Sequence, residues 1–476
     1  MKILIATNSG FQVRYLLQTD IFKRFLNQNI DLNIIAFPNE IDLIKEITNN
    51  RVNIIAEPQR PKKNFIEKYL GYMRFFTRAQ YNSTSVEIYK RMYNLGKTPF
   101  RKFGIYLLFL ISNLIKKSVL LRMFFVYFEK YASNYSEYKK ILKKIKPDFV
   151  LLASHGSFGF DKYIAYSAQS LNIKIFTVIL SWDNVTSQTY PAYYANYVIA
   201  WTEVMKRDIL RLIDYHDDQV IVAGSAYFDN YFKKHEFNKK KFLKENNFNL
   251  DKKIILFATR SPNSYPWHPN IAESISKIIN NDPDFLNWQL IIRPHPIHYR
   301  KDESGNMIYQ EVLDQYEKLN KEFSNVFIDY PKVFKSSKSF LMNNNDSINL
   351  VNLLRSADIL VNIFSTMNIE AAICDIPIIN ICYEYEKPMY KFNIQNPRFN
   401  IYSDIKESHN QRIVDSGGTA IAYNEQQLIY HLKSYILNPN KDKIGRQKIV
   451  DREVGPYRGY AGETIADTII GFAKEK

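Results

Sequence analysis

The strongest constraint on the fold is an alternation of short, apolar, β-branched runs with segments of helical length along the 476 residues. The first half contains the runs Lys2–Thr7, Leu32–Phe37, Val52–Ala56, Phe149–Ala153, Ile173–Leu180, Tyr197–Trp201 and Gln219–Ala223, and the second half contains Ile254–Ala258, Gln289–Ile292, Val326–Asp329, Ile359–Ile363 and Ile378–Ile381. Continuous apolar runs separated by helices are typical of parallel strands that are covered on both faces. The sequence therefore predicts an α/β protein with doubly wound sheets.

The alternation is interrupted twice, and these interruptions define the expected domains. Residues 60–146 have no convincing strand and are rich in basic and aromatic residues, which indicates a helical insertion. Residues 233–253 are rich in lysine and are the natural hinge. We expect an N-terminal domain over 1–232, a C-terminal domain over 254–458 and a final helix over 459–476. The predicted fold class is thus two Rossmann-like domains that face each other across a cleft.

The net charge of +16, together with 34 Tyr and 32 Phe, suggests attraction to polyanions. The positive charge is dispersed and no nucleic-acid-reading motif occurs, so nucleic-acid binding is disfavoured. An anionic membrane surface that meets the 60–146 insertion is one partner consistent with the charge, and an ordinary helical cap on the sheet is the alternative reading of that insertion.

The cysteines and the apolar segments indicate in which cellular compartment the protein is expected. Cys374 and Cys382 are the only cysteines, which excludes a disulfide framework. The most apolar segment, Ile105–Ile115, has about half the length that a membrane span needs. The chain starts directly in a strand pattern without an apolar signal core. We expect a cytoplasmic protein that can bind peripherally at the inner face of the cell membrane.

Ligands of open α/β sheets bind beyond the carboxyl ends of the strands, so the loops after the strands are the places to search. Arg293-Pro294-His295-Pro296 follows the run Gln289–Ile292 directly. Arginine can bind a diphosphate through forked hydrogen bonds, and histidine can donate a hydrogen bond or a proton to the leaving phosphate. The alternative is that the prolines only shape a turn in which His295 caps a helix. Arg260, which follows the run Ile254–Ala258, is positioned to reach a phosphate as well.

Phe364-Ser365-Thr366 follows the run Ile359–Ile363 and opens a helix that contains Glu370. Two hydroxyls at a helix N-terminus, next to free backbone N–H groups, form an anion site. The alternative is an ordinary Ser/Thr cap with a carboxylate one turn later. The co-occurrence of this segment with Arg-Pro-His-Pro two strands earlier favours a phosphate-binding role.

The loops that contain His295 and Ser365-Thr366 are similar to motifs of a known enzyme family. The region from about residue 254 to the end resembles the donor domain of GT-B glycosyltransferases, and is most similar to the branch of CDP-glycerol glycerophosphotransferases, bacterial sialyltransferases and Kdo transferases. In that branch a His-Pro motif and a Ser-Ser/Thr motif hold the nucleotide phosphates, and His295-Pro296 and Ser365-Thr366 match them. The resemblance also implies that Glu370, in the stretch 365–381, contacts the nucleotide ribose.

Two loops of the first half are candidates for binding the acceptor. In the stretch 181–187, Trp182 could stack on a sugar, and Asp183 could be the general base that deprotonates an acceptor hydroxyl. The alternative is a structural loop in which Trp182 is core and Asp183 caps a helix. In the stretch 154–159, His155 is a rival base, and Gly156 and Gly159 allow close backbone approach.

No Asp-x-Asp motif occurs in a convincing place, so we expect metal-independent transfer without a permanently bound cofactor. The expected reaction moves a sugar, or a polyol phosphate, from a UDP-, CDP- or CMP-linked donor to a cell-surface polysaccharide or a lipid-linked acceptor. One alternative is a nucleotide-sugar 2-epimerase, which shares the two-domain scaffold. Another is a non-catalytic, membrane-peripheral scaffold of a polysaccharide assembly complex.

Overall fold

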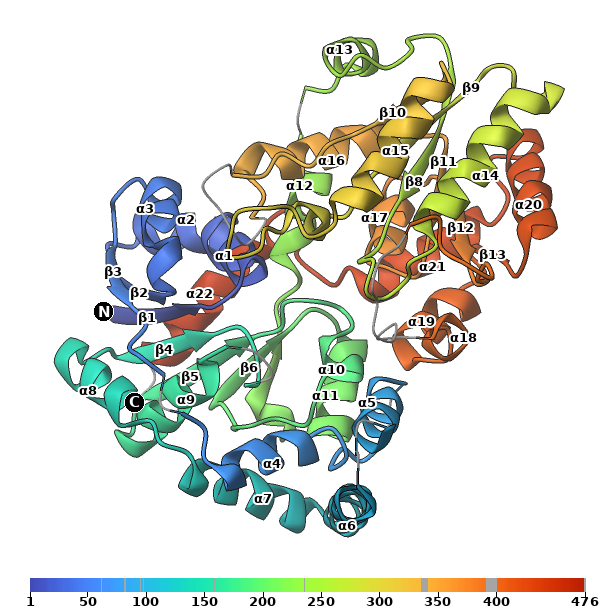
Figure 1. Ribbon diagram of the computed structural model, residues 1–476. Helices are drawn as coiled ribbons and strands as arrows, with labels where there is room; N and C mark the ends of the chain where they lie inside the picture. Colours follow the sequence, from blue (N-terminus) through green and yellow to red (C-terminus); the bar gives the residue numbers. More distant parts are fainter. Residues whose placement is uncertain are drawn as a thin grey trace. The chain divides into compact units, whose positions relative to one another are not determined.

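The computed structural model describes residues 1–60, 62–80, 83–94, 96, 98–156, 159–234, 236–334, 341–390 and 400–474. The chain divides into two compact units, of which the first contains residues 1–229 and 455–476 and the second contains residues 230–454 (Figure 1). Each unit is built on its own parallel sheet flanked by helices.

The first unit has a seven-stranded sheet in the order β3-β2-β1-β4-β5-β6-β7. Its strands are β1 Lys2–Thr7, β2 Asp31–Ala36, β3 Asn53–Ala56, β4 Phe149–Leu152, β5 Lys174–Val178, β6 Tyr197–Ala200 and β7 Val220–Val222. Its helices outside the insertion are α1 Gly10–Leu17, α2 Asp20–Asn27, α3 Ile41–Thr48, α9 Asp161–Ser170, α10 Asn184–Ser187, α11 Glu203–Ile213 and α22 Ala461–Lys474. The central strand β4 is buried at every position, as expected for a strand covered on both faces.

The second unit has a six-stranded sheet in the order β10-β9-β8-β11-β12-β13. Its strands are β8 Lys253–Ala258, β9 Trp288–Arg293, β10 Val326–Ile328, β11 Ile359–Asn362, β12 Ile378–Ile381 and β13 Ala420–Ala422. Its helices are α13 Lys239–Glu245, α14 His268–Asn281, α15 Gln310–Glu322, α16 Asn344–Ser356, α17 Met367–Ile373, α18 Ile401–Asp404, α19 Ser408–Asp415, α20 Glu425–Leu437 and α21 Lys443–Glu453, and α12 Asp229–Phe232 lies where the chain enters this unit. The predicted fold class, two parallel-sheet α/β units, is confirmed.

The predicted helical insertion is also confirmed. Between β3 and β4 the structure has α4 Phe65–Met73, α5 Ser83–Asn94, α6 Pro99–Ile115, α7 Val119–Ala132 and α8 Ser136–Ile145, and none of its described residues forms a strand. The segment expected as a hinge, residues 233–253, instead belongs to the second unit, where Phe242 and Leu243 of α13 are buried.

The C-terminal helix α22 belongs to the first unit, although the sequence placed it after the second domain. It packs against α2, and Arg24 and Asp467 form an ion pair at 2.8 Å. The carboxylate of Asp229 accepts the backbone N–H groups at the start of α22, at 3.0 and 2.8 Å. Gly455 permits the return of the chain because it has a φ of +86° and any Cβ there would lie 2.1 Å from the Trp201 carbonyl oxygen.

Candidate functional site

The order of the second sheet creates a switch point between β8 and β11, where successive connections leave in opposite directions. All strands of this sheet are parallel, so their carboxyl ends share one edge. Arg260 follows β8, His295 follows its neighbour β9, and Ser365 and Thr366 follow β11. The topology therefore brings the predicted donor-side loops to one edge of one sheet, on both sides of β8 (Figure 1).

The turn after β9 holds His295 in a defined orientation. The His295 backbone N–H donates to Thr259 Oγ1 at 2.9 Å, and His295 Nδ1 accepts the N–H of Ile297 at 3.1 Å. Because Nδ1 is an acceptor, the neutral ring carries its proton on Nε2. His295 thus caps the short 3-10 helix Pro296–Tyr299 with one nitrogen, and the other nitrogen is a donor. The residue is half-buried.

Arg293 is buried at the end of β9, and its guanidinium is held by two carboxylates. It forms ion pairs with Asp329 and with Asp346, the latter with oxygens at 2.8 and 2.9 Å. Burial acts to lower the pKa of Arg293, but the two carboxylates outweigh it and raise the pKa. With its donors committed in this way, Arg293 fits a role in positioning the turn in place of the direct phosphate contact expected from the sequence.

Arg260 lies at the end of β8, half-buried, and pairs with the buried carboxylate of Asp404. Its backbone N–H donates to His268 Nε2 at 2.7 Å. His268 is buried, and burial lowers its pKa, so its neutral ring is a structural acceptor in this loop. Arg260 therefore lies at the switch point, where its guanidinium is paired with the carboxylate of Asp404.

The loop after β11 is fixed by buried asparagines. Ser365 Oγ donates to Asn362 Oδ1 at 3.2 Å and accepts the Met367 N–H at 3.3 Å, and the Phe364 N–H donates to Asn380 Oδ1 at 3.2 Å. Phe364 has a φ of +32°, a strained value for a non-glycine residue that is often found at functional sites. Thr366 is half-buried, and its side chain does not cap α17. Helix α17 is short, with seven residues. We therefore attribute the polar character of this loop mainly to the hydroxyls of Ser365 and Thr366.

Glu370 lies in α17, as predicted, but its side chain is buried with an exposed fraction of 1%. Its carboxylate accepts a hydrogen bond from the hydroxyl of Tyr231, within the same unit. A ribose contact, which the resemblance implies, would have to compete with this hydrogen bond.

In the first unit, the loops after the neighbouring strands β4 and β5 meet at a small pocket. His155 lines it from one loop and Asn184 from the other, and its volume of about 20 Å³ is enough for one water molecule. Nε2 of His155 is buried without a hydrogen-bond partner. Burial lowers the pKa of His155 to about 4, so the ring is neutral at physiological pH.

Asp183 lies in the second of these loops, half-buried. Its carboxylate accepts hydrogen bonds from the hydroxyls of Ser181 at 2.5 Å and of Ser187 at 3.0 Å. Of the two readings of Trp182, burial favours the structural one, because this side chain is only 4% exposed. Gly156 and Gly159 have φ values of +80° and +57°, and a Cβ at either position would lie within 2.5 Å of a neighbouring side chain, Ala192 or Asn8. Ser157 and Phe158 of the same predicted loop lie outside the described residues.

Sequence reasoning missed a buried carboxylate at the switch point of the first sheet, between β1 and β4. Asp161, at the start of α9, accepts hydrogen bonds from Asn8 Nδ2, Gln12 Nε2 and Ser154 Oγ at 2.5, 3.0 and 2.8 Å. Burial raises the pKa of Asp161 to about 7, against the lowering effect of the hydrogen bonds from Ser154 and Gln12. The available signal was a set of amide side chains just after the first strand.

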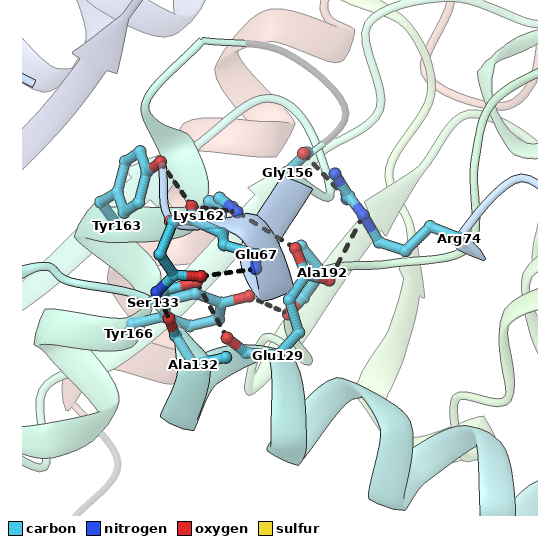
Figure 2. A network of polar contacts seen from close by, with 11 residues as sticks. Glu67, Arg74, Glu129, Ala132, Ser133, Gly156, Lys162, Tyr163, Tyr166 and Ala192 are labelled. Carbon is cyan, nitrogen blue, oxygen red and sulfur yellow. Dashed lines mark hydrogen bonds and ion pairs between the residues drawn. The ribbon is translucent and has the colours of Figure 1, made fainter. Parts of the chain in front are cut away.

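Sequence reasoning also missed the buried charges that join the insertion to α9 and to the loop after β4 (Figure 2). Lys162 Nζ lies 2.8 Å from Glu67 of α4 and 3.1 Å from Glu129 of α7. Arg74 pairs with Glu129 at 3.3 Å and donates to the Gly156 carbonyl at 2.9 Å. The insertion thus fixes the backbone of the loop that carries His155.

Comparisons with known proteins support the fold. A family model described as "Protein of unknown function (DUF354)" matches residues 227–428, and a search of the curated proteins gives no match. The structure is similar to a putative UDP-N-acetylglucosamine 2-epimerase from Listeria monocytogenes, with 11% identity and a TM-score of 0.55 over 100% of this chain and 97% of that one. A UDP-GlcNAc 2-epimerase from Neisseria meningitidis bound to UDP-GlcNAc has 13% identity and a TM-score of 0.54 over 99% and 100%.

A glycosyltransferase from Rickettsia africae is similar as well, with 14% identity and a TM-score of 0.50 over 100% of this chain and 98% of that one. These chains share the two-sheet arrangement over nearly their whole lengths. At identities this low, the likeness establishes the fold that nucleotide-sugar epimerases and a glycosyltransferase have in common, and it leaves the activity to be argued from the site.

Proposed function

We propose that this protein is a glycosyltransferase that takes a sugar, or a polyol phosphate, from a nucleotide-activated donor. The observation that carries the proposal is the placement of His295 and Thr366 on either side of β8, at the switch point of the six-stranded sheet. An Nε2–H donor and a hydroxyl that is not used as a cap are both suited to the oxygens of a diphosphate.

The chemistry assigned to this edge is stabilisation of the leaving group. In sugar transfer, an acceptor hydroxyl gives its proton to a base and attacks the anomeric carbon, the bond from that carbon to the phosphate oxygen breaks, and negative charge develops on the phosphate. In polyol-phosphate transfer, the hydroxyl gives up its proton and attacks the phosphorus that carries the polyol, and the nucleoside monophosphate leaves with the negative charge. His295 Nε2–H donates to the charged oxygen, and Thr366 adds a second hydrogen bond. Arg260 supplies positive charge at the same edge when Asp404 shares it with the ligand. The fixed turns supply these donors without reorganisation during the reaction.

We assign the acceptor, a cell-surface glycan or a lipid-linked sugar, to the carboxyl edge of the seven-stranded sheet. His155 and Asp183 are the alternative bases there. His155 is neutral and its Nε2 lacks a partner, which suits proton abstraction. Asp183 is half-buried and accepts two hydroxyl hydrogen bonds, which leave part of its acceptor capacity unused.

A 2-epimerase is the second candidate, because the structures of such enzymes share this fold over the whole chain. Epimerisation at C2 needs a base that removes a carbon-bound proton. At this edge Asp329 and Asp346 hold Arg293, Asp404 holds Arg260, and Glu370 accepts from Tyr231. These four carboxylates are engaged, so none of them supports the role of that base, and incubation without an acceptor distinguishes the two candidates.

The test is a thermal-shift screen of UDP, CDP, GDP and CMP on the full chain. CDP and CMP are included because the His-Pro and Ser-Thr motifs resemble the glycerophosphotransferase and sialyltransferase branch. We expect one nucleotide to raise the melting temperature of the wild type, and we expect His295→Asn to lose most of that response, because asparagine keeps the capping acceptor but lacks the Nε2–H.

Asn238→Ala is the matched control. It removes the exposed side-chain cap of α13, a helix that precedes β8 and belongs to none of the loops after the strands, and should lower stability by about 1 kcal/mol while keeping the nucleotide response. An equal response in wild type and His295→Asn would contradict the donor site. Incubation of the protein with the preferred nucleotide sugar, in the absence of an acceptor, distinguishes the two candidate activities. Accumulation of an epimerised nucleotide sugar would favour the 2-epimerase. A scaffold would show no shift with any nucleotide.

A further inference from the structure

The insertion presents an apolar surface that none of the described residues of its unit covers. Helices α6 and α7 are consecutive, are joined by residues 116–118 and pack against each other and against α4 (Figure 1). Soluble monomers rarely expose contiguous apolar patches of this kind, and such patches mark interaction sites. The side chains on the two helices show which kind of partner fits.

Helix α7 buries two charged side chains, together with Phe125 and Val126, and exposes other large apolar side chains. Leu120, Phe124 and Tyr131 are 78%, 63% and 82% exposed. Arg122 and Glu129, on the opposite face, are buried. A helix that faced water would show the reverse distribution. The outer face of α7 therefore matches an apolar environment.

The buried charges of α7 explain why this orientation is fixed. Arg122 forms a two-point ion pair with Asp214, at 2.6 and 2.8 Å. Glu129 lies between Lys162 and Arg74 (Figure 2). Turning α7 to hide its aromatic face would leave these buried partners unpaired, at a large cost. The buried ion pairs therefore keep the aromatic face of α7 pointing outward.

Helix α6 carries a matching stripe. Phe100, Phe103, Leu107, Leu110 and Leu114 are all exposed, and their spacing of three and four residues places them along one side of the helix. Phe100 and Phe103 are 87% and 62% exposed. We call the surface formed by the exposed apolar side chains of α6 and α7 the α6–α7 face.

The charges in this region have one sign. Residues 98–128 contain no Asp or Glu, and their basic residues besides the buried Arg122 are Arg101, Lys102, Lys116 and Lys117. Arg101 lies at the start of α6 and Lys117 lies in the turn before α7, and both are exposed. Such a distribution complements an anionic surface. Two copies of this face would bring like charges together without acidic partners, which disfavours self-association.

We propose that the α6–α7 face binds the surface of an anionic phospholipid bilayer, with both helices lying in the interface and their apolar side chains inserted among the acyl chains. Within the described ranges, no helix is long and apolar enough to cross a membrane. Binding at the bilayer surface is the arrangement that fits the side chains. This inference goes beyond the proposed transfer reaction and stands independently of it.

The test is cosedimentation of the full chain with vesicles. One set contains phosphatidylcholine and about one-third phosphatidylglycerol, and the other contains phosphatidylcholine alone. We expect binding to the anionic vesicles. Leu120→Ser with Phe124→Ser should weaken the partition coefficient by about tenfold or more, because two large apolar groups no longer leave water. Arg101→Gln with Lys117→Gln should weaken binding to anionic vesicles by about tenfold and reduce the anionic preference.

The matched control is Leu286→Ser with Leu437→Ser, two leucines of the second unit that are 71% and 86% exposed. This variant should bind like the wild type, and all variants should keep the wild-type melting temperature within a few degrees. The proposal is overturned if the wild type does not sediment with anionic vesicles, or if the α6 and α7 variants bind as tightly as the wild type. It is also overturned if light scattering shows a dimer that Leu120→Ser with Phe124→Ser dissociates, since a second copy would then cover the face.

Discussion

Replacement of Asp161 by asparagine is the most specific test of the electrostatics of the first unit. The carboxyl group is fully buried and accepts hydrogen bonds from Asn8, Gln12 and Ser154. Burial raises the pKa of this carboxyl group from its ordinary value of 3.8 to about 7. The Asp161→Asn side chain keeps the shape and cannot ionise, so a comparison of the two chains isolates the cost of the buried charge.

The magnitude follows from the pKa. The folded protein binds the proton more tightly than the unfolded chain does, so the contribution of Asp161 to stability is complete below about pH 4 and is lost as the pH rises through about 7. A shift of about three pKa units corresponds to about 4 kcal/mol. For a unit of this size, that change moves the melting temperature by on the order of 10 °C.

The assay is differential scanning fluorimetry of wild type and Asp161→Asn between pH 4.5 and 8. We expect the wild type to lose melting temperature relative to the variant as the pH rises. Asp42→Asn is the control, because its side chain is 96% exposed and the difference from wild type should stay flat. A flat difference for Asp161→Asn across the same window would refute the raised pKa.

Two further predictions concern the site loops. Arg293→Met leaves the buried carboxylates of Asp329 and Asp346 without a cation, so we expect a loss of about 3–5 kcal/mol, seen as a lower urea midpoint, and an unchanged midpoint would contradict the buried ion triad. His155 should stay neutral from pH 8 down to about 5, because burial lowers its pKa to about 4. The contribution of the neutral ring to the free energy of unfolding should be present above about pH 6.5 and be lost as the pH falls through about 4. An NMR titration of the ring with a midpoint near 6.5 would show instead that the imidazole is exposed to solvent.

Much of the fold could be predicted from the sequence because parallel strands covered on both faces need continuous apolar runs. Lys2–Thr7 and Ile378–Ile381 agree with β1 and β12 at both ends. The return of α22 to the first unit could not be predicted, because it depends on a distant cap by Asp229. The lysine-rich segment before β8 looked like a linker, but Phe242 and Leu243 anchor a helix within it.

The candidate site was only partly accessible from the sequence. Strand-exit loops could be identified, since their positions follow from topology, and His295 and Thr366 lie at the predicted edge. The partners of Arg293 could not be identified, because Asp329 and Asp346 are 36 and 53 residues away in the chain. The choice between the two readings of Trp182, a sugar-stacking or a core residue, could not be made from the sequence, because the burial of this side chain depends on packing. Side-chain pairing across a sheet edge depends on tertiary contacts that local patterns do not encode.

The most direct test of the donor-site assignment is hydrogen–deuterium exchange with and without the nucleotide that stabilises the chain most. Bound nucleotide should slow exchange in peptides that cover residues 294–298 and 364–368, and His295→Asn should abolish that protection. Unchanged exchange in both loops at saturating nucleotide would contradict a donor site at this edge of the six-stranded sheet.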